Sequence, residues 1–183
     1  MAATVVINRW TGSSGGPTKT AIQSANTVAN ASDAHQSTAS GSSNPIRIPS
    51  SSTNYSFWVS TRLSASTTPT GTINNIRWYT DGANNLGTGV TCKGNTATAY
   101  VQATGTTGTT GNILNTSNHA NLAGATADVF GHTSGSPKTV TGSITNPSTG
   151  DFGDFFVYQV EVGTTAGAGT TGSETFTWLY DET

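Results

Sequence analysis

Residues whose types could support catalysis or metal binding are few in this sequence, and they are scattered. Cys92 is the single cysteine, and the histidines are His35, His119 and His132. None of them stands at a zinc-like spacing, and Cys92 has no second cysteine with which to form an intrachain disulfide. The sequence therefore predicts neither a metal site nor a bound cofactor.

Three short motifs imitate catalytic or nucleotide-binding signatures without their context. Residues 167–172 (GAGTTG) match the dinucleotide fingerprint GxGxxG, but the strand-like stretch ETFTWLY follows where a helix would have to hold the pyrophosphate. Asp151-Phe152-Gly153 is similar to the metal-binding tripeptide of kinases, without the other kinase motifs. Residues 105–111 (GTTGTTG) lack the Gly-Lys-Ser/Thr end of a phosphate loop. We expect turns at all three places, and no enzymatic activity.

Uncharged polar residues dominate the composition. Thr, Ser and Gly together make up 79 of the 183 residues (36, 21 and 22), and 9% of the chain is charged, against about 25% in ordinary soluble domains. Thr favours strands, whereas Gly and Ser favour turns, so we expect many strands, many loops and little helix. The net charge of −2 gives no basic field for nucleic acid, and no stretch reaches the length of an apolar membrane span.

Hydrophobic alternation places the expected strands. The clearest stretches are residues 4–10, 54–63, 73–80, 155–162 and 174–180, and weaker ones are 87–92, 96–103, 125–130 and 137–145. Residues 19–29 fit a strand or a short helix, and a strand is favoured. We expect the last two clear strands to form a closing hairpin. Nine or ten strands at this spacing predict one all-β domain over residues 1–183, of the β-sandwich or jelly-roll type. Residues 11–53 would include an extended N-terminal arm or loop.

The charges are unevenly distributed. Residues 1–93 hold six Lys or Arg and two acids, whereas residues 94–183 hold one Lys and seven acids. Two interpretations remain open: scattered solvated charge, or complementarity between subunits. The second would place the acidic end, with Asp181 and Glu182, in a contact.

Other candidate contact residues are aromatic or flanked by proline. Trp10, Trp58, Trp78 and Trp178 all lie on expected strands; Trp178 fits a core, and Trp58 fits a core or an exposed contact equally well. Residues 45–49 place an apolar pair between two prolines, which suggests a docked segment. The predicted interface residues are Trp10, Pro45, Ile46, Arg47, Ile48, Trp58, Asp181 and Glu182.

Two stretches resemble a known class of protein. Residues 73–90 (INNIRWYTDGANNLGTGV) and the ending VYQVEVGTTAGAGTTGSETFTWLYDET are similar to small virion structural proteins of tailed bacteriophages. The resemblance implies a β-sandwich subunit of a particle: a capsid decoration (cement) protein, or a neck or tail component. We expect a homo-oligomer, such as a trimer, bound to a major capsid or other virion protein.

Such a subunit would assemble in the host cytoplasm and stay in the virion. The lone cysteine suits a reducing cytosol, and the opening residues MAAT show no secretory signal. A carbohydrate-binding or adhesin module, with Trp58, Trp78 and Tyr79 as a sugar platform, is the alternative from another class. A glycan-cleaving enzyme is a third, and it would need paired carboxylates.

Overall fold

The structure, a computed structural model, describes residues 2–23, 26–38 and 43–183. Strands hold 40% of the residues and helix 2%, and the helical element in the described part is a 3-10 turn, η1 (Val129–Gly131). The all-β prediction is confirmed. The described residues between β2 (Thr18–Ala21) and β3 (Thr53–Tyr55) form neither helix nor strand, as expected of a loop or arm. Residues 24–25 and 39–42 of the predicted arm fall outside the described residues.

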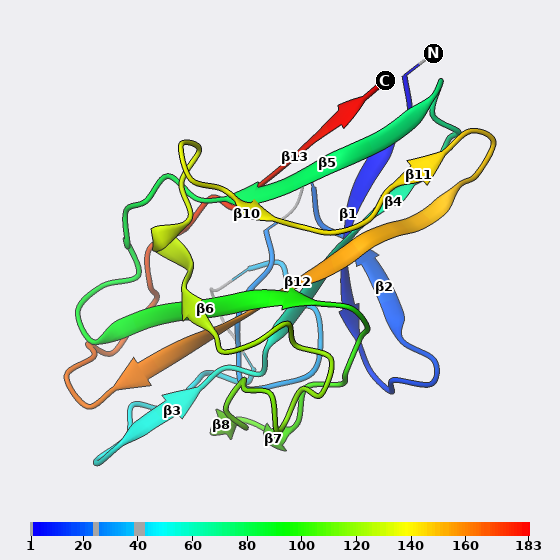
Figure 1. Cartoon of the computed structure of the whole chain (residues 1–183). Coiled ribbons are helices and arrows are strands. Elements are labelled where there is room, and N and C mark those ends of the chain that lie inside the picture. Colours follow the sequence, from blue (N-terminus) through cyan, green and yellow to red (C-terminus); the bar gives the residue numbers. More distant parts are fainter. Residues whose placement is uncertain (1, 24–25, 39–42) are drawn as a thin grey trace.

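The larger sheet, sheet A, is antiparallel and contains seven strands (Figure 1). Their order is β2, β1 (Val5–Thr11), β4 (Val59–Ala65), β12 (Gly150–Gly163), β6 (Val90–Ala97) and β9 (Ala127–Asp128), and β3 also pairs with β12. The long strand β12 therefore lies at the centre of the sheet and pairs with three others.

The smaller sheet, sheet B, is built around β5 (Thr72–Tyr79). Strand β13 (Thr177–Glu182) pairs with one edge of β5, and the two-residue strands β10 (Lys138–Thr139) and β11 (Ile144–Thr145) share the other. A separate short hairpin joins β7 (Gly105–Thr106) to β8 (Thr110–Gly111). Near the end of β13 the chain meets its first described residues, since the Ala3 N–H donates to the Glu182 carboxylate (Figure 1).

Strand β12 has apolar side chains on both of its faces because both faces of sheet A are covered. Phe156 and Tyr158 belong to a core between sheets A and B, which we call the intersheet core. Phe155 and Val157 point to the opposite face, as alternation along a strand requires, and belong to a second core. We call this second cluster the loop-covered core, because loop residues close it: Ala31, Ala103, Leu114 and Leu122.

Aromatic stacking joins the two sheets. The Trp78 ring of β5 lies 3.6 Å from that of Phe156 of β12, with an interplanar angle of 13°, and both residues are buried. Phe176 approaches the same Trp78 ring at 5.0 Å. The two layers agree with the predicted sandwich-like architecture, whereas its jelly-roll connectivity stays a prediction.

The predicted closing hairpin is wrong. Strand β12 pairs with β3, β4 and β6 of sheet A, whereas β13 pairs with β5 of sheet B. The connection between them, residues 164–176, carries the chain from sheet A to sheet B. Both predicted strands therefore exist, but they do not pair with each other. We call this connection the strap.

The predicted strand 54–63 is also interrupted. It divides into β3 and β4 around Ser56, whose N–H donates to the Val160 carbonyl at 2.8 Å. The Ser56 hydroxyl accepts a hydrogen bond from the Val160 N–H at 3.0 Å. A side-chain bond thus replaces a ladder bond where the chain leaves one strand for the next.

Candidate functional site

The proline-flanked segment, residues 45–49, is fixed by hydrogen bonds to its own chain. The Arg47 N–H donates to the Thr109 carbonyl at 3.2 Å, and Arg47 Nε donates to the Gly108 carbonyl at 3.1 Å. On the other side, Asn54 Nδ2 donates to the Arg47 carbonyl at 2.8 Å. The expected docked segment therefore lies against the β7–β8 hairpin and β3 of the same chain.

Part of this segment nevertheless faces outward. Ile46 is half-buried and packs against both cores. Pro45 and Arg47 are exposed, and Ile48 is 41% exposed. The segment thus presents an apolar side chain and a guanidinium group from a backbone that is already ordered.

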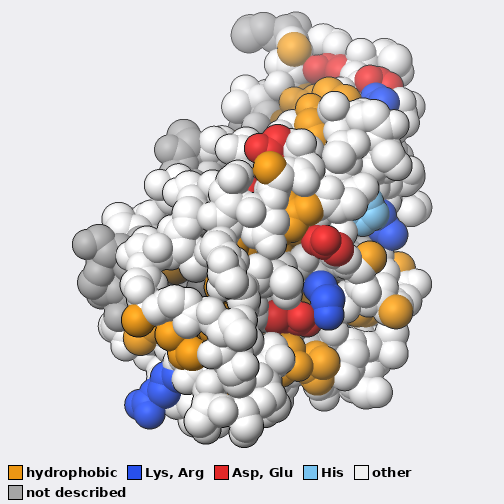
Figure 2. Space-filling view, turned by 90° about the vertical axis from the view of Figure 1, so that its left-hand side faces the viewer, with side chains coloured by type: hydrophobic (Ala, Val, Ile, Leu, Met, Phe, Trp, Pro, Cys, Tyr) orange, Lys and Arg blue, Asp and Glu red, His pale blue; other side chains and the backbone are white. Residues whose placement is uncertain are grey.

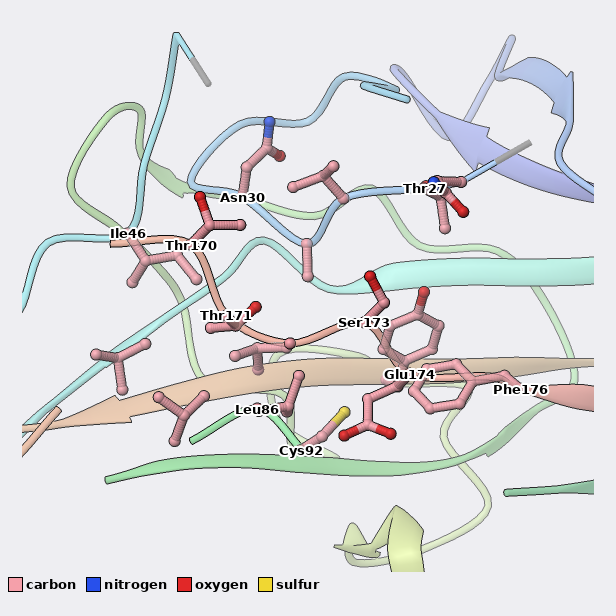
Figure 3. Close-up of a pocket in the computed structure, with 18 of the residues that line it drawn as sticks. Thr27, Asn30, Ile46, Leu86, Cys92, Thr170, Thr171, Ser173, Glu174 and Phe176 are labelled. Carbon is pink, nitrogen blue, oxygen red and sulfur yellow. The ribbon is translucent and has the colours of Figure 1, made fainter. Parts of the chain in front are cut away.

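Beside this segment lies a cavity of about 750 Å³ (Figure 3). Its floor is the inner face of sheet A, and its walls come from residues 26–30, the proline-flanked segment and the strap. Apolar floor residues include Ile7, Val90, Cys92, Val160 and Val162. Trp78 of β5 and Trp178 of β13 also line the cavity, so it reaches the part of the face that sheet B covers.

The composition of the strap explains why the space stays open. Residues 163–175 read GTTAGAGTTGSET, and the first large apolar side chain after them is Phe176. Phe176 packs against Tyr158 edge-to-face, with ring centroids 4.9 Å apart, and so anchors the end of the strap. A Gly/Thr-rich chain crossing an apolar face has no side chains that could fill the gap.

Two buried polar side chains lie at the wall formed by residues 26–30. Asn30 is 3% exposed, and its Oδ1 atom has no hydrogen-bond partner in the described residues, although Nδ2 donates to Gln36 at 3.2 Å. Behind this wall, Arg9 donates from Nη1 to Thr27 Oγ1 and to the Val28 carbonyl, each at 2.8 Å. Burial lowers the pKa of Arg9, and no carboxylate among the described residues forms an ion pair with it.

Few side chains that commonly catalyse bond cleavage line the cavity. Burial raises the pKa of the Cys92 thiol, so it stays protonated and is a poor nucleophile. None of the three histidines lines the cavity. Its one carboxylate, Glu174, accepts a hydrogen bond from the Asn85 N–H. Among the described residues, no three His, Cys, Asp or Glu side chains gather as metal ligands would.

The assignment of Trp58 to a contact surface is wrong. Trp58 is 3% exposed, its Nε1 donates to the Val101 carbonyl at 3.0 Å, and its ring packs on that of His119. Trp78 is 1% exposed, so the sugar platform of Trp58, Trp78 and Tyr79 does not exist. Alternation in the sequence predicts that Trp58 points away from the intersheet core. Loops cover that second face of sheet A as well, so Trp58 is buried there.

Trp10 is half-buried within its own chain. Its ring meets Phe155 edge-to-face at 4.9 Å, and Lys19 Nζ lies 4.5 Å from the ring centroid. Trp178, expected in the core, is also half-buried and packs against the intersheet core. A contact role for Trp10 stays a prediction, limited to its exposed part.

Three of the six bases in residues 1–93 are paired with acids of residues 94–183 within the chain. All three ion pairs in the described residues join a base from residues 1–93 to an acid from residues 94–183: Lys19–Asp151 at 2.5 Å, Arg77–Asp181 at 3.4 Å and Lys93–Glu161 at 3.0 Å. These groups are therefore partnered before any second subunit arrives. Figure 2 shows one face, where a few acidic and basic side chains lie near one another among backbone and uncharged side chains.

Glu182 ties the two ends of the chain together. Its carboxylate accepts hydrogen bonds from the Ala3 N–H at 3.1 Å and from the Thr70 N–H at 2.8 Å. The Thr70 backbone bond is the main reason that the pKa of Glu182 is lowered, and the Ala3 bond adds to it. Glu182 thus has a structural role, and Asp181 keeps a partly exposed carboxylate beside Arg77.

Sequence reasoning brought residues 45–48 to the site but missed the cavity beside them. Its walls come from three separate parts of the chain, which no sequence pattern brings together. The sequence did contain one signal of an unusual interior. Arg9 lies on the same face of β1 as Val5 and Ile7, so a charged residue occupies a position that faces the core.

No family model, no curated protein and no solved structure matches this chain. Within the described residues, no helix has the length and apolar character needed to cross a membrane.

Proposed function

We propose that this chain is a non-catalytic structural subunit of a virion: a decoration protein that binds an assembled capsid and stabilises it. The observation that carries the proposal is the proline-flanked segment, which holds Arg47 and Ile48 exposed on an ordered backbone. The resemblance of residues 73–90 and 157–183 to virion proteins supports the class of particle.

An ordered contact segment suits a protein that must bind a repeated surface. Association costs free energy for every side chain and loop that has to be immobilised. Because hydrogen bonds to Thr109, Gly108 and Asn54 already fix the backbone at Arg47, docking would order little more than the exposed side chains. Burial of Ile48 would then contribute directly to affinity.

Charged side chains would contribute less to attachment than the uneven distribution of charge along the sequence suggests. The ion pairs of Lys19, Arg77 and Lys93 are internal, so these three bases are already partnered within the chain. Attachment should therefore survive raised salt, because apolar burial is not screened. We further propose that the subunit acts as a homo-oligomer, such as a trimer, in the virion.

The test is a charge placed at the contact, with a matched control. Ile48→Glu should abolish co-sedimentation of the protein with virus particles. The particles are those encoded by the same genome as the protein. Ile113 has the same exposure, 41%, outside the segment, so Ile113→Glu should bind as the unmodified protein does. Equal binding of both variants would remove the segment from the contact, and loss of binding by both would point to non-specific adhesion.

A further inference from the structure

The free edge of β13 is a row of backbone groups without partners. Strand β13 pairs with β5 on one side, and Figure 1 shows it at the rim of sheet B. Thr72 and Thr183 exchange both backbone hydrogen bonds, at 2.7 and 2.9 Å. Because bonding alternates along an antiparallel pair, Leu179 also bonds towards β5, whereas Trp178 and Tyr180 point their N–H and C=O groups outward. Neither of these two residues has a backbone partner beyond the edge in the described residues.

The hydrogen bonds on the other side of β5 agree with this alternation. The Ile76 carbonyl accepts from the Val140 N–H at 2.9 Å, just after β10. Its neighbour Arg77, which stands opposite Leu179, therefore bonds towards β13. The register shift between Leu179 and Asp181 leaves the extra residue in β5, so the alternation of β13 itself is unbroken.

This edge lacks the features that keep sheet edges from pairing with another chain. Natural edge strands are protected by being very short, or by lysine, proline or a bulge. Strand β2 carries the exposed Lys19, and the edge strands β9, β10 and β11 have two residues each. Residues 177–180 (TWLY) carry neither a charge nor a proline, and Leu179 is 41% exposed on the outer face of sheet B.

We propose that a second copy of this chain pairs with β13 along this edge, antiparallel, around a two-fold axis at Leu179. Trp178 then lies opposite the partner's Tyr180 and exchanges both backbone hydrogen bonds with it, and symmetry repeats the pair. Leu179 lies opposite its own copy, in the closer non-hydrogen-bonded position, where its side chain is buried. Charge agrees with this register, which sets Asp181 opposite the partner's Thr177 rather than opposite another acid.

The contact supplies the self-association surface of the homo-oligomer proposed above, and its two-fold axis makes that oligomer a dimer or an assembly of dimers. In the monomer, which dominates at low protein concentration, Leu179 stays exposed. The capsid contact at Ile48 plays no part in the pairing. The two proposals therefore fail separately, since Ile48 variants are tested on particles and β13 variants in the free protein.

The experiment measures the dissociation constant of the dimer by sedimentation equilibrium of the whole protein. Leu179→Lys should weaken the dimer at least about tenfold, because it removes an apolar cross-strand pair and sets like charges opposite each other. Thr139→Lys is the matched control. Thr139 is exposed and pairs with Arg77 on the side away from β13, so the same charge beside the same residue should leave the dissociation constant unchanged.

Two further measurements locate the axis and the strand. Leu179→Lys and Leu179→Glu should each dimerise poorly alone but pair when mixed, since opposite charges then meet at the axis. In hydrogen exchange, the amides of Trp178 and Tyr180 should be protected in the dimer and exchange faster in Leu179→Lys. The Asp181 amide, which bonds towards β5, should keep its protection in both.

Three results would overturn the proposal. A protein that stays monomeric up to millimolar concentration has no such contact. A dimer that Leu179→Lys leaves intact uses another surface. Failure of the folded Lys and Glu variants to pair with each other places the axis away from Leu179.

Discussion

The two faces of sheet A are covered in different ways, and the difference lies in the side chains of the cover. On one face, loops close the core with Leu114 and Leu122 and pack against Trp58. On the other, sheet B covers one part and the Gly/Thr-rich strap the rest, where a cavity of about 750 Å³ remains. Irregular chain can therefore seal a sheet as well as a second sheet does, provided that it carries large apolar anchors.

The largest expected effects come from neighbouring phenylalanines on opposite faces of β12. Phe156→Ala in the intersheet core and Phe155→Ala in the loop-covered core should each lower the free energy of unfolding by about 3–5 kcal/mol, since the residues are 0% and 1% exposed. Urea denaturation of both variants measures this, with exposed Leu179→Ala as the control. A much smaller loss for Phe155→Ala would mean that the loops yield, and that the two covers are not equivalent.

Gln159 connects the loop cover to the sheet. Its Nε2 donates to the Ser56 carbonyl at 2.7 Å and to the Asn112 carbonyl at 2.8 Å, and its Oε1 accepts from the Leu114 N–H at 2.7 Å. Gln159→Leu should cost at least about 3 kcal/mol, because it leaves three backbone groups without a partner and each unpaired buried group costs about 1–3 kcal/mol. Hydrogen exchange should show faster exchange at the Leu114 amide. Unaltered protection there would show that the loop is held by apolar contacts alone.

The loop-covered core should also be sensitive to acid. His119 is fully buried beside Trp58, and neither ring nitrogen has a partner in the described residues. Burial lowers its pKa below 6.5, so the unfolded chain binds more protons than the folded one once the pH falls below about 6.5. Stability is full above this window and should fall by up to about 1.4 kcal/mol per pH unit within it.

His119→Phe keeps the ring contact and removes the titration. Its unfolding free energy should vary less between pH 7 and pH 5 than that of the unmodified protein. Some dependence should remain, because burial also lowers the pKa of His35 and His132. Identical pH profiles for the two proteins would assign the acid sensitivity to other groups.

The smallest effect concerns the ion pairs outside both cores. Lys19 and Asp151 are 44% and 17% exposed at their side chains, and such pairs contribute about 0–1 kcal/mol. Asp151→Asn should therefore change the unfolding free energy by less than about 1 kcal/mol, and by nothing measurable in 1 M NaCl, where screening acts within about 3 Å. A larger loss of unfolding free energy that does not change with salt would show that the ion pairs between the two parts of the chain are a main determinant of stability.

The fold class could be predicted because alternation and Thr content act locally. The strand at residues 73–80 appears as β5 within one residue, and the inward set Phe156, Tyr158, Val160 and Val162 lies in one core as expected. Pairing could not be predicted, since β12 and β13 alternate equally well whichever sheet they join. The burial of Trp58 depends on the loop cover over the far face of the sheet, which no pattern within 54–63 encodes.

The candidate site was predictable only in part, for the same reason. Prolines around Ile46 and Ile48 indicated a fixed, extended segment, and hydrogen bonds at Arg47 fix it. The cavity arises because the strap lacks large side chains and crosses the uncovered end of sheet A. The lack of large side chains in the strap can be seen in the sequence. Where the strap crosses sheet A cannot, because it depends on the path of the chain between the two sheets.

Imaging of assembled particles by electron cryo-microscopy tests the central claim most directly. We expect copies of this subunit on the outer surface of the capsid, with the proline-flanked segment facing the shell and Ile48 buried in the contact. We also expect that Ile48→Glu particles lack this density. Subunits located only in the neck or tail, or capsid-bound subunits with residues 45–49 facing solvent, would contradict it.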